Sequence, residues 1–513
     1  MFLQQFFTPG LGHASYLVGD EGAGEAVVID PRRDVDGYLR AAAGRGLAIR
    51  HVLETHTPND YVSGARELAA LTGATCWASG AGGGAGLRFG HQALLEGGEV
   101  RAGSLTLRAW ETPGHTPEHL AFLAFDGPAG APVAAFTGGS LLAGGAGRTD
   151  LAGTGRSREL ARAQYESLRR LLALPAHVQV YPTHGGGSLC AGASDSPWST
   201  VGREQEANEM ARLALGGDPQ AFAGRLLEGL PPLPGHWRRM HARNRRGPVP
   251  LAGLGAAPGL ESLLPPRPLA PDTVLHLVES GQAHVVDARG PEAFGGAHVP
   301  GSFAVGLGHT FGVWVGSVVP DDRPLVLVLP GPDDPLPGPL LAVWGEAVRQ
   351  LLRAGYDRLA GYLEGGVRAW AARGLPVRAL PQLSPREAWE GLQRGERSLL
   401  DVRQPAEWRR GHPPDATFVP GATLPARVTA LRGRPWAVIC ATGYRSTVAA
   451  SVLLRAGMPD ALPDSAQSAE PGGAPSVANV LGGMAAWKAA GLPETSEVEA
   501  QGAPRRRATR PAA

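Results

Sequence analysis

Short apolar runs alternate with glycine-rich turns through the first half of the chain. The runs "EAVVIDP", "SLTLRAW", "VAAFTGG" and "VQVYPTHG" have the length and composition of strands. The longer stretch "ELARAQYESLRRLLAL" carries apolar residues at helical spacing. This pattern predicts a sandwich of sheets and helices over residues 1–246, with loops gathered at the strand ends.

A repeat occupies the second half. It follows residues 247–272, a stretch rich in Pro and Gly that we interpret as a linker. Beyond it, "HVVDARGPEAFGGAHVPGS" matches "LLDVRQPAEWRRGHPPDATFVPGA", and "LAGYLEGGVRAWAARGLPV" matches "VANVLGGMAAWKAAGLPET". Residues 273–378 and 379–497 are therefore expected to form two related α/β units around parallel sheets. Residues 498–513 are predicted to be a disordered tail.

Composition and charge narrow the function classes. A chain of 513 residues is long enough for several domains. Its net charge of +1 argues against a nucleic-acid partner or a membrane-binding face. The N-terminal stretch meets Pro9 and Gly10 before any long apolar run, which predicts neither a secretory signal nor a membrane span. Only three cysteines are present, Cys76, Cys190 and Cys440, so we expect no disulfide framework and a cytoplasmic protein. Homo-oligomerisation is left open.

The second repeat unit carries a candidate nucleophile. In "RPWAVICATGYRSTVAASVLLRAG" a buried strand is expected to end at Cys440, and a helix to begin after a short loop. Loop amides and the positive end of the helix dipole both favour a thiolate, and would also hold a persulfide anion. The alternative is that a cysteine ending a buried strand is an inert core thiol. Cys190 has no general base suggested nearby and Cys76 has the surroundings of a strand residue, so both are interpreted as structural.

The loop "CATGYRS" resembles the active loop of the rhodanese family, and "LLDVRQPAEWRRGH" and "LGGMAAWKAAGLP" resemble its flanking signatures. The resemblance implies an α/β rhodanese fold that needs no cofactor for its reaction. It also implies roles for the residues of the matching motifs: catalytic loop residues Cys440, Ala441, Thr442, Gly443, Tyr444 and Arg445, and substrate-binding residues Asp401 and Arg403.

The first repeat unit lacks these features. Its strand "RPLVLVLPGPDDPLPGP" reaches Pro330 where the cysteine should be. Proline has no N–H to offer, and the two aspartates that follow would repel a sulfur anion. We expect an inactive rhodanese-like domain whose work is packing and positioning.

The N-terminal domain resembles the metallo-β-lactamase fold, and in particular bacterial persulfide dioxygenases fused to rhodanese units. The runs that carry this resemblance are "LETHTPNDYVSG", "ETPGHTPEHLAFLA", "FTGGSLLAGGAGRTDL" and "VYPTHGGGSLC". It implies an αββα sandwich and a single iron held by His56, His115 and an aspartate. The chain departs from the pattern at three positions: Gly139 replaces that aspartate, and Pro58 and Tyr61 replace two histidines of the two-zinc hydrolases.

The candidate metal ligands that remain are His56, His115, His184 and Asp60. A rearranged site around one Fe or Zn ion, held by the three histidines, is one interpretation. The other is that His115 and His184 hydrogen-bond to loop backbones while Asp60 caps the "ARELAAL" helix. Arg148, in the same resemblance, braces the site together with Asp150 or faces a thiol substrate; a structural Arg–Asp pair is the alternative.

Three functions follow from these motifs. The first is a sulfurtransferase that passes sulfane sulfur from a persulfide or thiosulfate to a thiol through Cys440. The second adds a metal-dependent persulfide dioxygenase or thioester-type hydrolase in the N-terminal domain. The third is a non-catalytic sulfur carrier or scaffold. All three imply small-molecule sulfur compounds as partners.

Overall fold

The computed structural model describes residues 1–81, 87–127, 130–188, 196–228, 230–251, 265–331, 339–458 and 477–496. The predicted tail, half of the predicted linker and Cys190 lie outside these ranges. Among the described helices, none is long and apolar enough to cross a membrane.

The chain forms two compact units, divided differently from a simple cut along the sequence. The first comprises Met1–Arg267, Gly308–Ser317 and Pro339–Leu359. The second comprises Pro268–Leu307, Val318–Gly338 and Ala360–Ala513. Two segments of the first repeat therefore pack with the N-terminal unit.

The N-terminal unit contains two six-stranded sheets, ordered β1-β2-β3-β4-β5-β6 and β14-β13-β10-β9-β8-β7, and a small β11-β12 hairpin. The strands are β1 Phe2–Thr8, β2 His13–Asp20, β3 Glu25–Ile29, β4 Ala48–Leu53, β5 Thr75–Ser79, β6 Gln92–Leu94, β7 Glu99–Ala102, β8 Leu105–Glu111, β9 Leu120–Asp126, β10 Ala134–Gly138, β11 Leu141–Leu142, β12 Gly145–Ala146, β13 Gln179–Pro182 and β14 Ser199–Thr200. The helices are α1 Asp36–Ala43, α2 Ala65–Thr72, α3 Ser157–Leu172, α4 Val201–Ala207, α5 Glu209–Leu215, α6 Pro219–Leu227 and α7 Trp237–Arg246, with a short 3-10 turn η1 at Thr154–Arg156.

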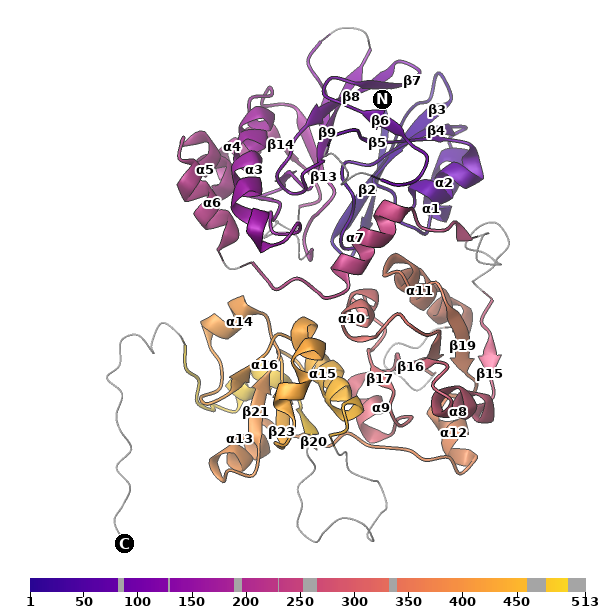
Figure 1. Cartoon of the computed structure of the whole chain (residues 1–513), viewed down its shortest axis with the longest axis vertical. Helices are drawn as coiled ribbons and strands as arrows, with labels where there is room; N and C mark the ends of the chain where they lie inside the picture. The colour runs from indigo at the N-terminus through magenta and orange to yellow at the C-terminus, as the bar shows by residue number, and fades with distance from the viewer. Residues whose placement is uncertain are drawn as a thin grey trace. The chain divides into compact units, whose positions relative to one another are not determined.

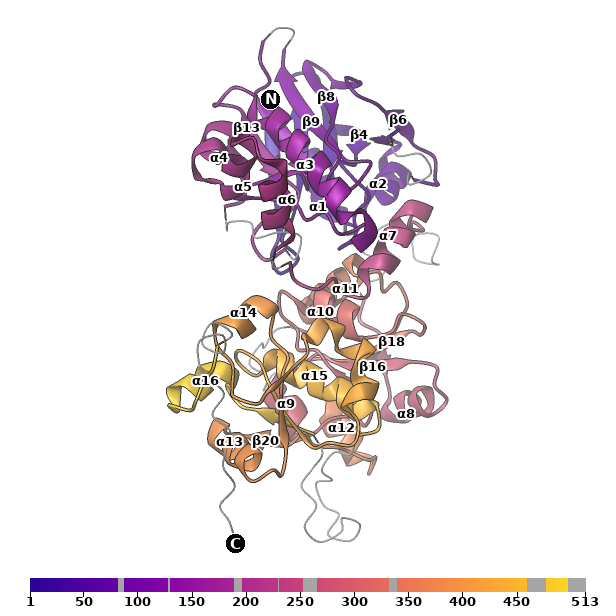
Figure 2. The ribbon, with the colours of Figure 1, turned by 60° about the vertical axis from the view of Figure 1, so that its left-hand side comes forward.

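Three apolar clusters show that this unit is layered. One lies between the two sheets and includes Phe122 and Phe136. The second joins the first sheet to α1 and α2, and the third joins the second sheet to α3, α5 and α6. Helices thus cover both outer faces of the paired sheets, as Figures 1 and 2 show. The predicted αββα sandwich is confirmed.

The helix α11 (Leu340–Arg353) is held firmly within this first unit. The Arg353 guanidinium donates to both carboxylate oxygens of Asp34, at 2.7 Å to Oδ1 and 2.5 Å to Oδ2. The carbonyl of Arg353 accepts the Val62 N–H at 2.8 Å. Because Val62 directly follows the candidate ligand region, the end of α11 helps to fix that loop.

Two five-stranded sheets have the same strand order, β15-β19-β18-β16-β17 in the first repeat and β20-β24-β23-β21-β22 in the second. The strands are β15 Pro268–Leu269, β16 His284–Asp287, β17 Phe303–Ala304, β18 Leu325–Val328, β19 Leu359–Leu363, β20 Gln382–Leu383, β21 Ser398–Asp401, β22 Thr417–Phe418, β23 Trp436–Ile439 and β24 Val477–Val480. The helices are α8 Pro271–Glu279, α9 Pro291–Gly296, α10 Phe311–Val318, α12 Gly366–Ala372, α13 Pro385–Gln393, α14 Pro405–Arg410, α15 Tyr444–Arg455 and α16 Gly483–Ala489, with 3-10 turns η4 Gly421–Ala426 and η5 Val428–Leu431. This confirms the predicted pair of related α/β folds.

Candidate functional site

The Cys440 loop joins a buried strand to a helix. All four residues of β23 are buried, and α15 begins four residues after Cys440. Gly443 caps α15 with φ = +106°, a conformation that other residues adopt only with strain. The sequence folds here as predicted because an apolar strand, a glycine turn and a helix-forming stretch follow each other directly.

The Cys440 sulfur lies inside a cradle of hydrogen-bond donors. The Gly443 N–H donates to Sγ at 3.1 Å, and the Ser446 hydroxyl donates to Sγ at 3.3 Å. The side chain is 1% exposed, but the amide of its own loop faces the sulfur. Donors that surround a sulfur atom at a helix N-terminus stabilise an anion there, whether thiolate or persulfide.

Two glycines that follow β24, Gly482 and Gly483, pack against this loop. Gly483 has φ = +53°, and a Cβ at this position would lie 2.3 Å from the Cys440 carbonyl oxygen. The Met484 N–H donates to that oxygen at 2.7 Å, and the Ala485 N–H donates to the Ala441 carbonyl at 3.0 Å. The Gly-Gly pair that the sequence repeat carries is therefore the point where the start of α16 packs against the backbone of the Cys440 loop.

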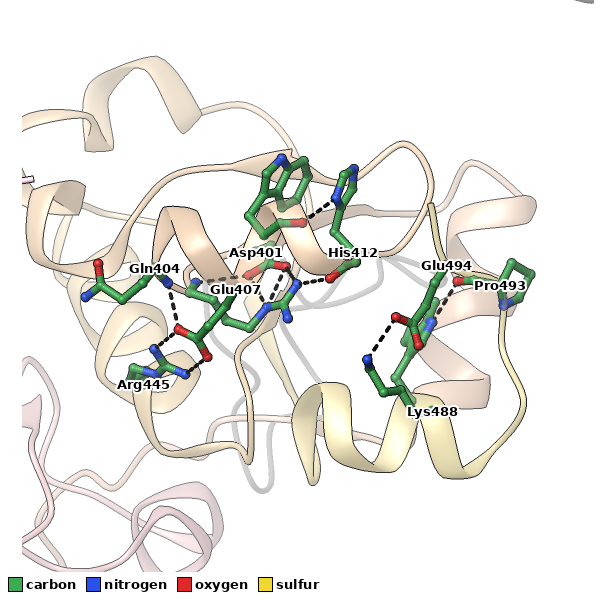
Figure 3. A network of polar contacts seen from close by, with 12 residues as sticks. Asp401, Gln404, Glu407, His412, Arg445, Lys488, Pro493 and Glu494 are labelled. Atoms are coloured by element: carbon green, nitrogen blue, oxygen red, sulfur yellow. Dashed lines mark hydrogen bonds and ion pairs between the residues drawn. The ribbon is translucent and has the colours of Figure 1, made fainter. Parts of the chain in front are cut away.

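Arg445 points to a carboxylate. Its Nη1 and Nη2 donate to Oε2 and Oε1 of Glu407, both at 2.7 Å, as Figure 3 shows. Burial opposes the charge on Arg445, but the hydrogen bonds that Arg445 donates to Glu407 outweigh burial and raise the Arg445 pKa. Burial likewise opposes ionisation of Glu407, and pairing with Arg445 outweighs it, so the Glu407 pKa is lowered. Sequence reasoning did not single out Glu407, because 38 residues separate it from its partner.

Asp401 and Arg403 form a hydrogen-bonded ion pair. Arg403 Nε and Nη2 donate to Oδ2 of Asp401 at 2.9 and 2.7 Å, and Nη2 also reaches the Gly411 carbonyl at 2.8 Å. Both side chains are buried. Tyr444 also makes a contact outside the loop, since its hydroxyl donates to the Gly306 carbonyl at 2.9 Å. Ala441 and Thr442 complete the loop between Cys440 and Gly443.

In the N-terminal unit, three histidines come together at the strand ends. His56, His115 and His184 are buried, and each offers a ligand atom within 4.8 Å of the others. The Nε2 atoms of His56 and His184 are 3.3 Å apart. His115 Nε2 is buried and has no hydrogen-bond partner among the described residues. The structure brings together the three histidines of the first interpretation, while His115 Nδ1 also hydrogen-bonds to a loop carbonyl, as the second interpretation expects.

Neighbouring groups turn the ring lone pairs toward the centre. His115 Nδ1 lies 2.9 Å from the Arg148 carbonyl, which only accepts, so Nδ1 carries the proton and Nε2 the lone pair. Thr55 Oγ1 donates to Asp30 and lies 2.8 Å from His56 Nδ1, which fixes the same tautomer in His56. This pattern of outward Nδ1–H and inward Nε2 is typical of metal-ligating histidines.

Burial keeps these rings neutral, as metal ligation requires. Desolvation lowers the pKa of His115 to about 3 and that of His184 to about 4. Desolvation, followed by the nearby histidines, lowers the pKa of His56 well below its usual value. A cavity of about 20 Å³ borders His56, which is room for about one water molecule.

The missing aspartate has a steric explanation. A Cβ on Gly139 would lie 2.1 Å from Cδ2 and 2.5 Å from Nε2 of His115, so the His115 ring occupies the space that a side chain would need. His119, which the sequence analysis did not single out, lies behind this point. Its Nε2 accepts the Gly139 N–H at 2.9 Å, so His119 supports the site without facing its centre. Its place in the run "GHTPEH" was the only signal available.

Asp60 lies beside His184, with Oδ2 3.5 Å from Nδ1. The alternative that Asp60 caps the following helix is wrong, because α2 has its N-cap at Gly64 and the Ser63 hydroxyl accepts the Ala65 N–H at 3.0 Å. Asp60 is instead positioned to orient His184 from outside the ring cluster.

The buried Arg148 pairs with the half-buried Asp150. Arg148 Nε and Nη2 donate to Asp150 at 2.7 and 2.8 Å, and Nη2 also donates to the Pro231 carbonyl at 2.8 Å. Arg148 reaches the histidine cluster through its backbone carbonyl. Cys76 is buried in the first sheet, where desolvation raises its pKa to about 12, in keeping with a structural thiol.

Two family models match the chain. The metallo-beta-lactamase superfamily matches residues 8–184, and the rhodanese-like domain matches residues 270–373 and 384–490. A hydroxyacylglutathione hydrolase of Methylococcus capsulatus is 39% identical over 171 residues, which are 33% of this chain and 60% of that protein. The chain therefore spans less than two thirds of the length of these hydrolases.

A mitochondrial persulfide dioxygenase ETHE1 of Mus musculus is 31% identical over 220 residues, which are 42% of this chain and 77% of that protein. A crystal structure of a metallo-beta-lactamase from Staphylococcus aureus matches with a TM-score of 0.58 and 28% identity, covering 70% of this chain and 98% of that one. The chain thus belongs to the metallo-beta-lactamase superfamily, with an N-terminal domain similar to persulfide dioxygenase ETHE1 followed by two rhodanese-like domains.

Proposed function

We propose that this protein is a sulfane-sulfur sulfurtransferase, in which Cys440 takes sulfur from a persulfide or thiosulfate and passes it to a thiol or cyanide. The observation that supports this most strongly is the position of Sγ, which receives the Gly443 N–H and the Ser446 hydroxyl at the start of α15. An inert core thiol needs no such donors. The rhodanese match over residues 384–490 includes this loop.

The reaction has two displacements. The Cys440 thiolate attacks the outer sulfur of the donor, a new S–S bond forms, and the donor's own S–S bond breaks as a thiolate or sulfite leaves with the electron pair. The cradle then holds the terminal sulfur of the enzyme persulfide, Cys440–S–S⁻. An acceptor thiolate attacks that terminal sulfur, which leaves as the acceptor's persulfide and regenerates the Cys440 thiolate.

Replacement of Cys440 by Ser tests this function directly. We expect C440S to lose turnover with both thiosulfate and a low-molecular-weight persulfide, whereas C76A, at the other described cysteine, keeps it. Full turnover by C440S would refute the proposal. A single sulfur loaded on Cys440 without repeated turnover would identify a carrier in place of an enzyme.

The histidine cluster supports a second activity. We propose that His56, His115 and His184 hold one iron or zinc ion, because three neutral ring nitrogens converge and His115 Nε2 has no hydrogen-bond partner among the described residues. A bound ion of this kind supplies Lewis acidity and, if it is iron, oxygen chemistry. The likeness to persulfide dioxygenase favours oxidation of a persulfide over thioester hydrolysis. The protein's own residues orient the ligands through Arg148, Thr55 and Asp60.

Elemental analysis separates the two activities. Wild type is expected to carry about one equivalent of metal, and three coordinating rings are the smallest set that makes a stable site with an open position. H184A should lose that metal and keep sulfur transfer, while C440S should keep the metal and lose sulfur transfer. Equal metal content in wild type and H184A would overturn the three-histidine assignment. Small sulfur compounds are the proposed partners and the cytoplasm the proposed compartment.

A further inference from the structure

The charge balance around the Cys440 loop bears on its substrate. Arg445 is the cation that the loop itself supplies. Its guanidinium donates hydrogen bonds to both carboxylate oxygens of Glu407 at 2.7 Å. The other arginine of this network, Arg403, forms an ion pair with Asp401 at 2.7 Å. Each of these arginines thus has its own carboxylate, and Figure 3 shows the pair of Arg445 and Glu407.

We propose that Glu407 sets the donor selectivity of Cys440: by neutralising Arg445, it favours persulfide donors and disfavours the dianion thiosulfate. The inference rests on the proposed sulfurtransferase function and adds its substrate class. A persulfide brings at most one negative charge to the reacting sulfur, and the neutral donors Gly443 N–H and Ser446 Oγ–H can hold such an anion. A dianion needs a cation that is not already paired.

Comparison with the first repeat shows that the Glu407 pair is not a requirement of the fold. Asp287 and Arg289 form the same pair as Asp401 and Arg403, at 2.6 Å, in a unit that has no reactive cysteine. At the position of Glu407, by contrast, the aligned sequence of the first repeat has Ala293. The Asp–Arg pair belongs to the shared scaffold, whereas the glutamate accompanies Cys440 and Arg445.

Glu407 also stabilises the N-terminus of α14, and a test must distinguish this structural role from its effect on donor selectivity. Its Oε2 accepts the Gln404 N–H at 2.9 Å and so closes a capping box on α14. The same unit offers a matched control, because Glu387 closes a capping box on α13, where its Oε2 accepts the Ser384 N–H at 2.7 Å. Glu387 lies on another helix, and its carboxylate hydrogen-bonds to Ser384.

The experiment compares kcat/KM for thiosulfate and for glutathione persulfide in the full-length wild type, E407Q, E407D and E387Q. Freeing Arg445 in E407Q is expected to raise the thiosulfate-to-persulfide ratio about tenfold, which corresponds to about 1.4 kcal/mol. E407D keeps the charge and should stay near the wild-type ratio, and E387Q should match wild type. The gain in E407Q should shrink as ionic strength rises, because the added attraction is electrostatic.

An unchanged or lowered ratio in E407Q would overturn the inference, as would an equal rise in E387Q. If E407Q does not fold, R445Q leaves the Glu407 carboxylate without its cation, and this negative charge is expected to lower the thiosulfate-to-persulfide ratio below wild type. A ratio that stays constant in R445Q also contradicts the inference. The proposed function fails separately, if wild type transfers sulfur from neither donor.

Discussion

The two rhodanese-like repeats share a scaffold and differ in one loop. Both have the same strand order and the same Asp–Arg pair, in which the aspartate is buried. Both also have a histidine stacked on an aromatic ring, His298 on Phe294 and His412 on Trp408. Only the second ends its central strand in a cysteine with donors around it. This fold is therefore held together by groups remote from the sulfur chemistry, and the reactive loop can be lost without loss of the sheet.

If the Asp–Arg pairs are structural, breaking them should damage both repeats alike. D401N and D287N each leave a buried arginine without its full charge partner, and such a loss costs about 3–5 kcal/mol. Hydrogen exchange of the amides in β21 and β16 should show comparable loss of protection in the affected repeat. A large effect for D401N with none for D287N would mean that the scaffold is not shared.

Replacing the second glycine of each Gly-Gly pair should affect the two repeats differently. In G483A the new Cβ meets the Cys440 carbonyl at 2.3 Å, which adds a clash to the unfavourable φ of +53°. In the first repeat, Gly366 has φ = +61° and no described atom within 4 Å of such a Cβ. We expect G483A to lose about 2–4 kcal/mol and most sulfur transfer, and G366A about 1–2 kcal/mol with transfer retained.

Thermal unfolding of the two variants, with sulfur transfer measured in parallel, checks this contrast. Similar costs and similar activities for G483A and G366A would show that the contact with the Cys440 carbonyl is not part of the site.

The smallest expected effect concerns pH. The lowered pKa of Glu407 means that its ion pair contributes stability above the unfolded-state pKa of about 4.3, and that this contribution is lost as pH falls through the folded-state value. For a partly exposed pair it amounts to about 1 kcal/mol. The Tm of wild type should therefore exceed that of E407Q at pH 6 and approach it below pH 4, while E387Q serves as control. A difference that is independent of pH would assign the effect to helix capping alone.

The reactive loop was predictable because its parts are adjacent in sequence. Strand, Cys440, Gly443 and helix follow one another, so local patterns were enough to place the sulfur at a helix N-terminus. The partner of Arg445 was not predictable in this way, because Glu407 reaches it from α14 through the tertiary fold.

For the histidine cluster, the sequence predicted which residues belong to it but not how they pack. The sequence identified His56, His115 and His184, but not that the His115 ring fills the space beside Gly139 or that His119 stands behind it. Those facts depend on how rings from separate strands pack, which spacing along the chain does not encode. The Asp60 cap was a reasonable prediction from its place before a helix, and it fails because the intervening turn supplies Ser63 in its stead.

The most direct test of the central claim is mass spectrometry of the protein after brief exposure to glutathione persulfide. The account predicts one added sulfur atom on the peptide that contains Cys440 in wild type, removed by a thiol acceptor, and no such addition in C440S. Sulfur found on Cys76 instead, or an unmodified Cys440 in protein that turns over, would contradict it.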